Sequence, residues 1–483
     1  MQIEATPLPR YEYILAVLVL FGAAFLLYAG SFGHAWTYDD FPVLVNNPDI
    51  RSLTNFFEDR YAVRPLRELT YLIDYALFGL KPAGYHVQNI FWHGLSGLLL
   101  FLLVLRLGGQ RFVAWGTALV FIAHPVLVEV VANISHRKDS LALAFALAAT
   151  LVFHQSFQSN QRNRRILWLG LSILLALLAY AAKENAIALV PLAFAFEWAF
   201  VTKERRLLTR FPSVVFLLAL MGVAYGGYWY LSGGRDAYLR GALFLFSKMS
   251  YYGLVNEWSY GLMLLKSWAF MFVKTLVPVN LAVEYTYPTP TSLLDPWVLA
   301  GMGLLLAGCL GLWFCWRRAP LLFFFLAWIG AFWIPVSNVW PLAYFAADRY
   351  LYAPMAGVAV LFCSALPVVL SRSRPLRWWA LCLCVIALAA LTWHQNRVWH
   401  DESTLWSHAV EVSPESVYAL NNLGVLYNRR GDVPTALKLI GKAAENPFYQ
   451  NAQSNMASLY DYLGQKERAA FYRQRAKNPH ANR

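Results

Sequence analysis

A chain of 483 residues that is 59% hydrophobic and only 14% charged is too apolar for a set of soluble domains. Its net charge of +13 comes from short basic clusters between apolar runs, which indicates membrane topology and excludes a nucleic-acid-binding stripe. We therefore predict an all-α, polytopic membrane protein, because helices satisfy their own backbone polar groups in lipid.

Apolar length and flanking charge predict about eleven membrane-spanning helices. They lie at residues 12–31, 88–106, 112–132, 140–157, 166–182, 185–202, 212–231, 297–316, 320–336, 350–370 and 378–394. Basic clusters then occupy alternate loops, beginning with Arg10, and these loops are expected on the cytoplasmic side.

Residues 260–280 do not fit this scheme directly. The segment is apolar enough to cross a bilayer, but it contains Lys266 and Lys274. We predict an interfacial or re-entrant helix here, inside an external loop at 232–296. If the segment crosses or another span does not, the number of crossings becomes twelve or ten.

Two adjacent carboxylates, Asp39 and Asp40, follow the first predicted span by a few residues. A carboxylate pair where a helix leaves the membrane is a candidate general base, and the alternative is a pair of solvated acids without a function. The surrounding external loop, residues 32–87, is too apolar to be disordered. Its spacing predicts helices that lie along the membrane surface and roof a cleft.

Further charged groups fall on the same, non-cytoplasmic side. Charges at the edge of apolar spans are costly, so each needs a partner or a function. Five cations are candidates for binding a donor phosphate: Arg349, Arg64, Lys183, Arg137 and Lys138. Four residues are predicted to support the site: His124, Glu129, Glu184 and Asp348. The alternatives are a structural histidine next to a proline, a neutralising Lys183–Glu184 pair, and an arginine that extends to the membrane interface.

After residue 395 the composition becomes that of a soluble domain, and a repeat appears. Gly424, Tyr427, Gly431, Ala436 and Ala443 recur 33 residues later as Ala457, Tyr460, Gly464, Ala469 and Ala476. This pattern predicts two tetratricopeptide (TPR) repeats, capped by a helix at 402–412. We divide the chain into a membrane domain at 1–395 and an external TPR domain at 396–483, which either binds a protein partner or serves as a structural cap.

A carboxylate and several cations on one face resemble a base beside an anion-binding site. If the leaving group is a polyprenyl phosphate, a carboxylate deprotonates the acceptor hydroxyl while a cation stabilises the departing phosphate. A single displacement of this kind inverts the anomeric configuration of the transferred sugar. We expect no metal and no other cofactor, although Asp39 and Asp40 leave a divalent cation open.

Short motifs in a shared order also resemble a known family. They are Tyr38-Asp39-Asp40, Arg64-Pro65-Leu66, Tyr85-His86-Val87-Gln88-Asn89, His124-Pro125 with Glu129, Ala182-Lys183-Glu184-Asn185, Pro335-Val336-Ser337-Asn338 and Asp348-Arg349-Tyr350. Over nearly its whole length the chain resembles membrane glycosyltransferases of the GT-C class, most closely the TMTC O-mannosyltransferases. The resemblance implies that Asp39 is the catalytic base, with Asp40 as its neighbour or substitute. It also implies a dolichyl-phosphate mannose donor and protein Ser or Thr acceptors.

We therefore predict an inverting glycosyltransferase that moves a sugar, mannose in that family, from a polyprenyl-phosphate donor to an extracytoplasmic hydroxyl, with protein Ser or Thr as the expected acceptor. The TPR domain is expected to engage that protein, on the outer side of a bacterial or archaeal plasma membrane. The alternative is a non-catalytic membrane scaffold that recruits a partner through its repeats. A transporter fits less well, because the acidic residues gather on one face and not at mid-membrane.

Overall fold

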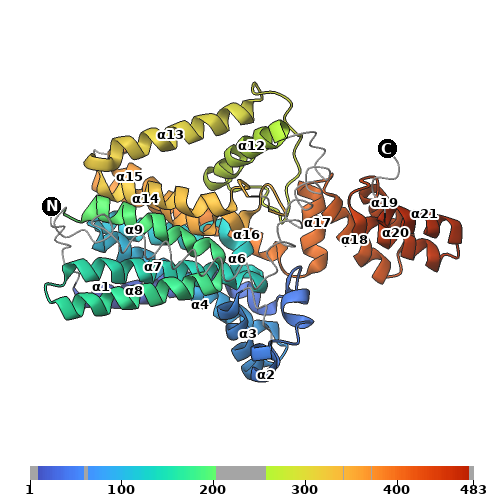
Figure 1. Cartoon of the computed structure of the whole chain (residues 1–483), viewed down its shortest axis with the longest axis horizontal. Helices are drawn as coiled ribbons and strands as arrows, with labels where there is room; N and C mark the ends of the chain where they lie inside the picture. The colour runs from blue at the N-terminus through green and yellow to red at the C-terminus, as the bar shows by residue number, and fades with distance from the viewer. Residues whose placement is uncertain (1–8, 59–63, 203–256, 341, 371–372, 478–483) are drawn as a thin grey trace.

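The protein is a bundle of long helices that lie along the longest axis of the molecule, with shorter helices projecting from one end (Figure 1). The computed structural model describes residues 9–58, 64–202, 257–340, 342–370 and 373–477. Within these ranges all regular secondary structure is helical, which confirms the predicted all-α fold.

Seven helices in the described part of the chain are long and apolar enough to cross a membrane. They are α1 with η1 (Arg10–Gly33), α4 (Pro82–Arg106), η4 with α7 (Ile134–Gln158), α8 (Arg162–Ala182), α13 (Pro296–Arg318), η9 with α15 (Asp348–Val369) and α16 (Arg374–Val398). This set is that of an integral membrane protein.

A further apolar segment consists of two helices that bend by 53° at a break, and it is either a broken span or a re-entrant loop. The first is α5 (Arg111–Ala123), and η3 (Pro125–Leu127) and α6 (Val128–Ala132) follow it. Pro125 lacks a backbone N–H and its ring clashes with a preceding turn, so the helix breaks at this position. The segment predicted as a span at 112–132 is therefore helical, but it is not one straight helix.

Two predicted spans correspond to shorter helices, and one cannot be compared. The apolar helix α14 (Pro320–Trp333) continues into η8 (Ile334–Val336) and covers the span predicted at 320–336. The span predicted at 185–202 is η5 (Glu184–Ala188) followed by α9 (Leu189–Phe200). The span predicted at 212–231 lies outside the described residues.

The segment predicted to be interfacial or re-entrant contains α12 (Glu257–Leu276), which packs beside α13 (Figure 1). Its Lys266 donates to Asp295 Oδ2 over 3.1 Å, and Asp295 caps the N-terminus of α13. The charge of Lys266 in this apolar helix is thus neutralised. Helix α12 is not among the seven long apolar helices.

Arginines mark one set of helix ends in the bundle. They begin or end α1 at Arg10, α4 at Arg106, α5 at Arg111, α8 at Arg162, α13 at Arg318 and α16 at Arg374. The opposite ends carry the residues predicted to form the site, such as Arg137 at the start of α7 and Asp348 at the start of η9. We call the end of the bundle with these arginines the basic end, and the end with the predicted site residues the functional end.

The first loop contains η2 (Phe41–Val45), α2 (Leu53–Glu58) and α3 (Pro65–Phe78), to one side of the bundle near the projecting helices (Figure 1). On α3, the apolar residues Leu69, Ile73 and Leu77 are exposed at four-residue intervals. Such a stripe is typical of a helix that lies on a membrane surface.

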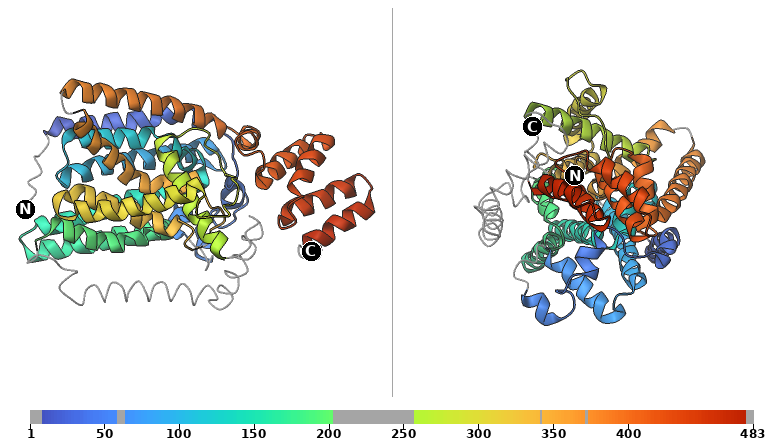
Figure 2. Two further views of the ribbon diagram at one scale, coloured as in Figure 1. Left: turned by 90° about the horizontal axis from the view of Figure 1, so that it is seen from above. Right: turned by 90° about the vertical axis from the view of Figure 1, so that its right-hand side faces the viewer.

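Five helices form the C-terminal part: α17 (Glu402–Val412), α18 (Val417–Arg429), α19 (Val433–Ala443), α20 (Gln450–Tyr462) and α21 (Lys466–Lys477). The left view of Figure 2 shows α16 at the edge of the bundle, leading into them. The predicted boundary between residues 395 and 396 falls inside α16, which continues to Val398. One hydrophobic core extends from the bundle through Trp406 to Leu423 of α18, so α17 and α18 are packed onto the membrane domain.

Candidate functional site

The Thr37–Asp40 segment follows the first span and is held in an unusual conformation. Tyr38 has a φ of 53°, which is rare for a residue with a bulky side chain. The buried Asp40 carboxylate accepts the backbone N–H of Ser135 over 2.8 Å and that of Thr37 over 3.1 Å. Asp40 therefore connects the first loop to the start of α7.

The two adjacent carboxylates lie in different surroundings. Burial raises the pKa of Asp40 to about 7, against the opposing effects of its two backbone hydrogen bonds and of the nearby Lys138. Asp39 is partly exposed, and within the described chain its carboxylate accepts no hydrogen bond. Asp39 is thus the carboxylate that an incoming hydroxyl can reach, and Asp40 anchors the loop.

Arg349 lies near the same loop and is paired with Glu129. Its guanidinium donates to Glu129 Oε1 over 2.5 Å, and its backbone N–H donates to Glu129 Oε2 over 2.8 Å. The rings of Tyr344 and Tyr350 stack against the guanidinium at 5.1 and 5.3 Å. Burial raises the pKa of Tyr38, the charge of Arg349 lowers it, and the charge of Asp39 raises it further. Both charged groups therefore lie within electrostatic reach of Tyr38.

Three other predicted phosphate-binding cations are also paired with carboxylates. Arg137 is fully buried, 2.5 Å from Asp74 Oδ2, and donates to Asn89 Oδ1 over 2.8 Å. The other two pairs are Lys183 with Asp139, and Arg64 with Glu184 at 2.7 Å. These contacts lower the pKa of Glu184 to about 2 against the effect of burial, so both members of that pair are charged at neutral pH.

Lys138 differs from the other four cations. Its side chain is buried, it lies close enough to Asp40 to affect the pKa of that group, and no described carboxylate lies within 4 Å of its ammonium. An isolated buried ammonium is costly unless an anion accompanies it. Among the five predicted cations, Lys138 is therefore the one without a carboxylate within 4 Å in the described chain.

The sequence prediction missed His136, although it belongs to the Ser135–Asp139 run. This buried ring has Nε2 3.6 Å from Glu129 Oε1 and Nδ1 3.9 Å from Asp139 Oδ2. Neither nitrogen has a hydrogen-bond partner among the described residues. His136 thus lies between the two carboxylates that neutralise Arg349 and Lys183.

Two predicted supporting residues make contacts that hold the fold. His124 Nδ1 accepts the backbone N–H of Val126 over 3.3 Å, and His124 Nε2 lies 3.1 Å from the Thr275 carbonyl oxygen. One ring nitrogen therefore caps the helix break at Pro125, and the other connects this break to α12. Asp348 accepts a hydrogen bond of 2.6 Å from the Tyr285 hydroxyl, which connects η9 to the segment after α12.

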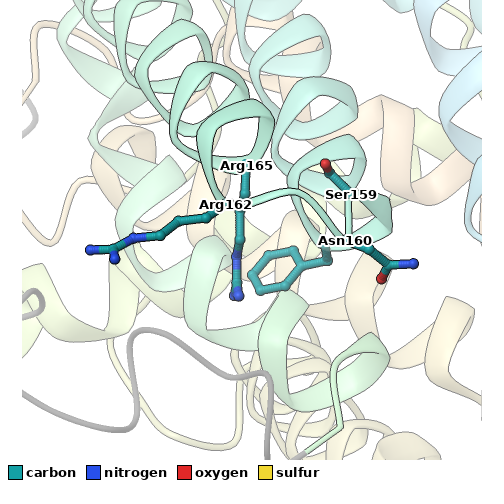
Figure 3. Close-up of a pocket in the computed structure, with 5 residues that line it drawn as sticks. Ser159, Asn160, Arg162 and Arg165 are labelled. Carbon is teal, nitrogen blue, oxygen red and sulfur yellow. The ribbon is translucent and has the colours of Figure 1, made fainter.

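A surface hollow of about 220 Å³ lies where α7 turns into α8, lined by Phe157, Ser159, Asn160, Arg162 and Arg165 (Figure 3). Phe157 follows Lys138 on α7 by 19 residues (157 − 138), which is about 28 Å at a rise of 1.5 Å per residue. It therefore belongs to the basic end and does not contribute to the site.

The described residues contain no group of three or more His, Cys, Asp or Glu side chains arranged to hold a metal ion. Asp40 already accepts two backbone hydrogen bonds, which leaves Asp39 as the accessible ligand in this loop. A cation bound here would take its other ligands from water or from substrate.

Comparison with known proteins identifies relatives of one kind. No protein-family profile matches the chain. The sequence is 25% identical over 488 residues to Protein O-mannosyl-transferase F38B6.6 of Caenorhabditis elegans, across 91% of this chain and 64% of the relative. It is also 25% identical over 495 residues to Protein O-mannosyl-transferase TMTC3 of Mus musculus, across 92% and 52%. These relatives confirm the resemblance to TMTC proteins, and the chain spans between half and two thirds of their length.

Among solved structures, the crystal structure of ArnT from Cupriavidus metallidurans bound to undecaprenyl phosphate aligns with 94% of this chain and 80% of ArnT. The TM-score is 0.42 and the sequence identity 15%.

Proposed function

We propose that the chain is an inverting glycosyltransferase that transfers a sugar from a polyprenyl-phosphate donor to a hydroxyl of an extracytoplasmic protein. The observation that carries the proposal is the placement of Asp39, a partly exposed carboxylate between two anchored neighbours: Tyr38 lies within electrostatic reach of Arg349, and Asp40 lies within electrostatic reach of Lys138. The names of its relatives, protein O-mannosyl-transferases, support mannose as the sugar and protein Ser or Thr as the acceptor.

In the proposed reaction Asp39 acts as the general base. The acceptor oxygen forms a bond to the anomeric carbon while the bond from that carbon to the phosphate oxygen breaks. Asp39 takes the hydroxyl proton, and the lipid phosphate leaves with the bonding electrons, so no general acid is required. Attack on the face opposite the leaving group inverts the anomeric configuration.

The leaving phosphate is assigned to Lys138, with Arg349 as its neighbour. Arg64, Arg137 and Lys183 each have a carboxylate partner, so their charges are already balanced within the protein. Lys138 has none in the described chain, and a phosphate would supply its missing counter-charge. Arg349 remains a candidate because its guanidinium has more donors than the contact with Glu129 uses.

The proposed orientation follows from the charges at the helix ends. Arginine-bearing ends face the cytoplasm by the positive-inside rule, which places Asp39 and the helices after α16 on the outer side. As expected from the sequence, we assign this membrane to a bacterial or archaeal cell. We also propose that transfer needs no metal ion, because two cations are available to the departing phosphate.

The test is sugar transfer by the purified full chain from a polyprenyl-phosphate mannose to a Ser/Thr peptide, with and without a chelator. Asp39→Asn should lower kcat by roughly 10²–10⁴-fold, the usual range for loss of a general base. Transfer at the wild-type rate by Asp39→Asn would exclude this base. If the wild-type chain transfers from none of the lipid-phosphate sugars tried, the scaffold alternative is favoured.

A further inference from the structure

An aromatic cluster connects the first loop to the C-terminal helices. The Tyr38 ring lies edge-on to Trp406 of α17 at 5.7 Å and to Tyr418 of α18 at 6.2 Å between ring centroids. Trp406 and Tyr418 contact each other at 5.6 Å. Residues almost 370 positions apart therefore form one contact, immediately next to Asp39 in the sequence.

Tyr344 extends this cluster to Arg349. Its hydroxyl lies 3.2 Å from that of Tyr38, and its ring lies 6.0 Å from the ring of Tyr418. The Tyr344 ring also contacts the guanidinium of Arg349, which connects the aromatic cluster to this cation. The same four aromatic residues thus border both the proposed base and a cation of the proposed phosphate site.

The Tyr38 backbone needs such support. A left-handed conformation is unfavourable at a residue with a bulky side chain and persists only when the surroundings impose it. Asp40, on the other side of Asp39, is fixed by the N–H groups of Thr37 and Ser135. Asp39 is therefore positioned through its two neighbours: Asp40 is held by backbone N–H groups, and Tyr38 is held by the aromatic cluster.

The C-terminal helices are firmly seated where they supply this contact. His408 Nε2 lies 3.0 Å from the Leu281 carbonyl oxygen, Ser413 Oγ donates to the Glu284 carbonyl oxygen over 3.2 Å, and Ser416 Oγ donates to the Glu284 carboxylate. The backbone N–H of Ala35 donates to the His400 carbonyl oxygen over 2.9 Å. These contacts, together with the shared core, exclude a loosely tethered module.

From this geometry we infer that Trp406 and Tyr418 are positioning residues of the active site. The start of the C-terminal module forms part of the wall that orients Asp39 and Arg349, in addition to any role in acceptor binding. The expected effect on kcat rests on the proposed function. The effect of Tyr418 on the position of Asp39 depends only on the fold.

The kinetic experiment compares Tyr418→Ala and Tyr418→Phe with Tyr472→Ala in the full chain. Tyr472 stacks on Tyr460 at 5.6 Å in the outer repeat and provides a matched control. Tyr418→Ala should lower kcat on a short peptide by roughly 10–100-fold, because small displacements of a catalytic group have effects of this size. Tyr418→Phe, which keeps the ring, should recover most of the rate, and Tyr472→Ala should retain it. An unchanged kcat for Tyr418→Ala, with a higher KM only for protein acceptors, would show recruitment and overturn the inference.

A second readout does not depend on transfer. In Asp39→Cys the new thiol is labelled with a charged, membrane-impermeant reagent, with the wild-type chain as background. Adding Tyr418→Ala or Trp406→Ala should change the labelling rate several-fold, and adding Tyr472→Ala should not. Equal rates in all backgrounds would overturn the coupling even if transfer is detected. If the labelling rate changes but the wild-type chain shows no sugar transfer, the effect of Tyr418 on position 39 is retained and the proposed function is rejected. Tyr418→Leu, which removes the ring but keeps an apolar side chain, serves if the alanine variants do not fold.

Discussion

The functional end of the bundle and the outer repeat each contain an ion pair between an arginine and a carboxylate, but the two pairs lie in opposite surroundings. Arg349 and Glu129 leave only 10% and 2% of their side chains exposed, whereas Arg473 and Asp461 of the outer repeat leave 53% and 39%. An exposed pair contributes little to stability, while loss of one buried partner leaves a charge without compensation. Burial, and not residue type, therefore determines which pair matters.

The tyrosines of the two regions differ in the same way. In the outer repeat, Tyr460 and Tyr472 belong to the one helical hairpin that their own helices form. At the functional end, Tyr38 and Tyr418 join the first loop to the last domain. The first contact supports one repeat, and the second connects two parts of the chain that must meet for the site to form.

After Asp39→Asn, the largest expected effect is at the buried ion pair. Arg349→Ala should reduce transfer by roughly 10²–10³-fold and also destabilise the protein, because Glu129 loses its partner. Arg473→Ala should change neither kcat nor the thermal midpoint appreciably. The double variant Arg349→Ala with Glu129→Gln removes the unpaired charge, and transfer at the wild-type rate by this variant would remove Arg349 from the donor site.

Lys138→Met separates function from stability. We expect transfer to fall by about 10²-fold, with the loss of a cation that faces the leaving phosphate. Because no described carboxylate within 4 Å loses a partner and a buried amine is replaced by an apolar side chain, the thermal midpoint should rise or stay constant. The control is Lys466→Met, at an exposed position of α21. A lower midpoint for Lys138→Met would show that Lys138 has a structural partner, contrary to this assignment.

Asp40 should give the protein a characteristic pH dependence. Its pKa rises from 3.8 to about 7 on folding, so the folded state binds more protons than the unfolded state between these values. Stability should therefore decrease as pH rises from about 4 to 7 and then remain level. We expect the thermal midpoint in detergent to be a few degrees lower at pH 8 than at pH 5, and Asp40→Asn to abolish that difference. The same difference in the variant would assign the effect to another group.

The smallest effects are expected within the repeats. A Cβ added at Gly424 would lie 2.5 Å from Ile440 Cγ1 and 3.2 Å from the Ile440 backbone nitrogen. Gly424→Ala should therefore destabilise the α18–α19 hairpin by about 1–3 kcal/mol. At Gly441 the nearest atom is Met456 Cε at 4.0 Å, so Gly441→Ala should stabilise its helix by up to about 1 kcal/mol. Thermal unfolding followed by circular dichroism tests the sign of both, and equal shifts would contradict the packing described for Gly424.

The sequence predicted the features that depend on local patterns. Apolar runs located the long helices, and the 33-residue period located the hairpins α18–α19 and α20–α21. It did not predict the break at Pro125 as a bend of 53°, because that angle depends on how both halves pack. It also placed a domain boundary inside α16, where a change in composition does not interrupt the helix.

The sequence did not predict which carboxylates lie next to which cations. Arg137 and Lys138 are neighbours in the first turn of α7, yet successive side chains on a helix point about 100° apart. One meets Asp74 of α3, and the other lies near Asp40. Their partners come from distant segments, so their different roles become visible only after folding. The contact of Tyr38 with Tyr418 was missed for the same reason.

The joint between the first loop and α18 also has a consequence for biosynthesis. A ribosome produces residues 37–40 early and Tyr418 almost 400 residues later. During translation the nascent chain would thus carry its carboxylates without the aromatic wall that orients them. A chain interrupted before α17 would lack the contacts of Trp406 and Tyr418 with Tyr38, so its first loop would stay unsupported until the last helices are made and docked.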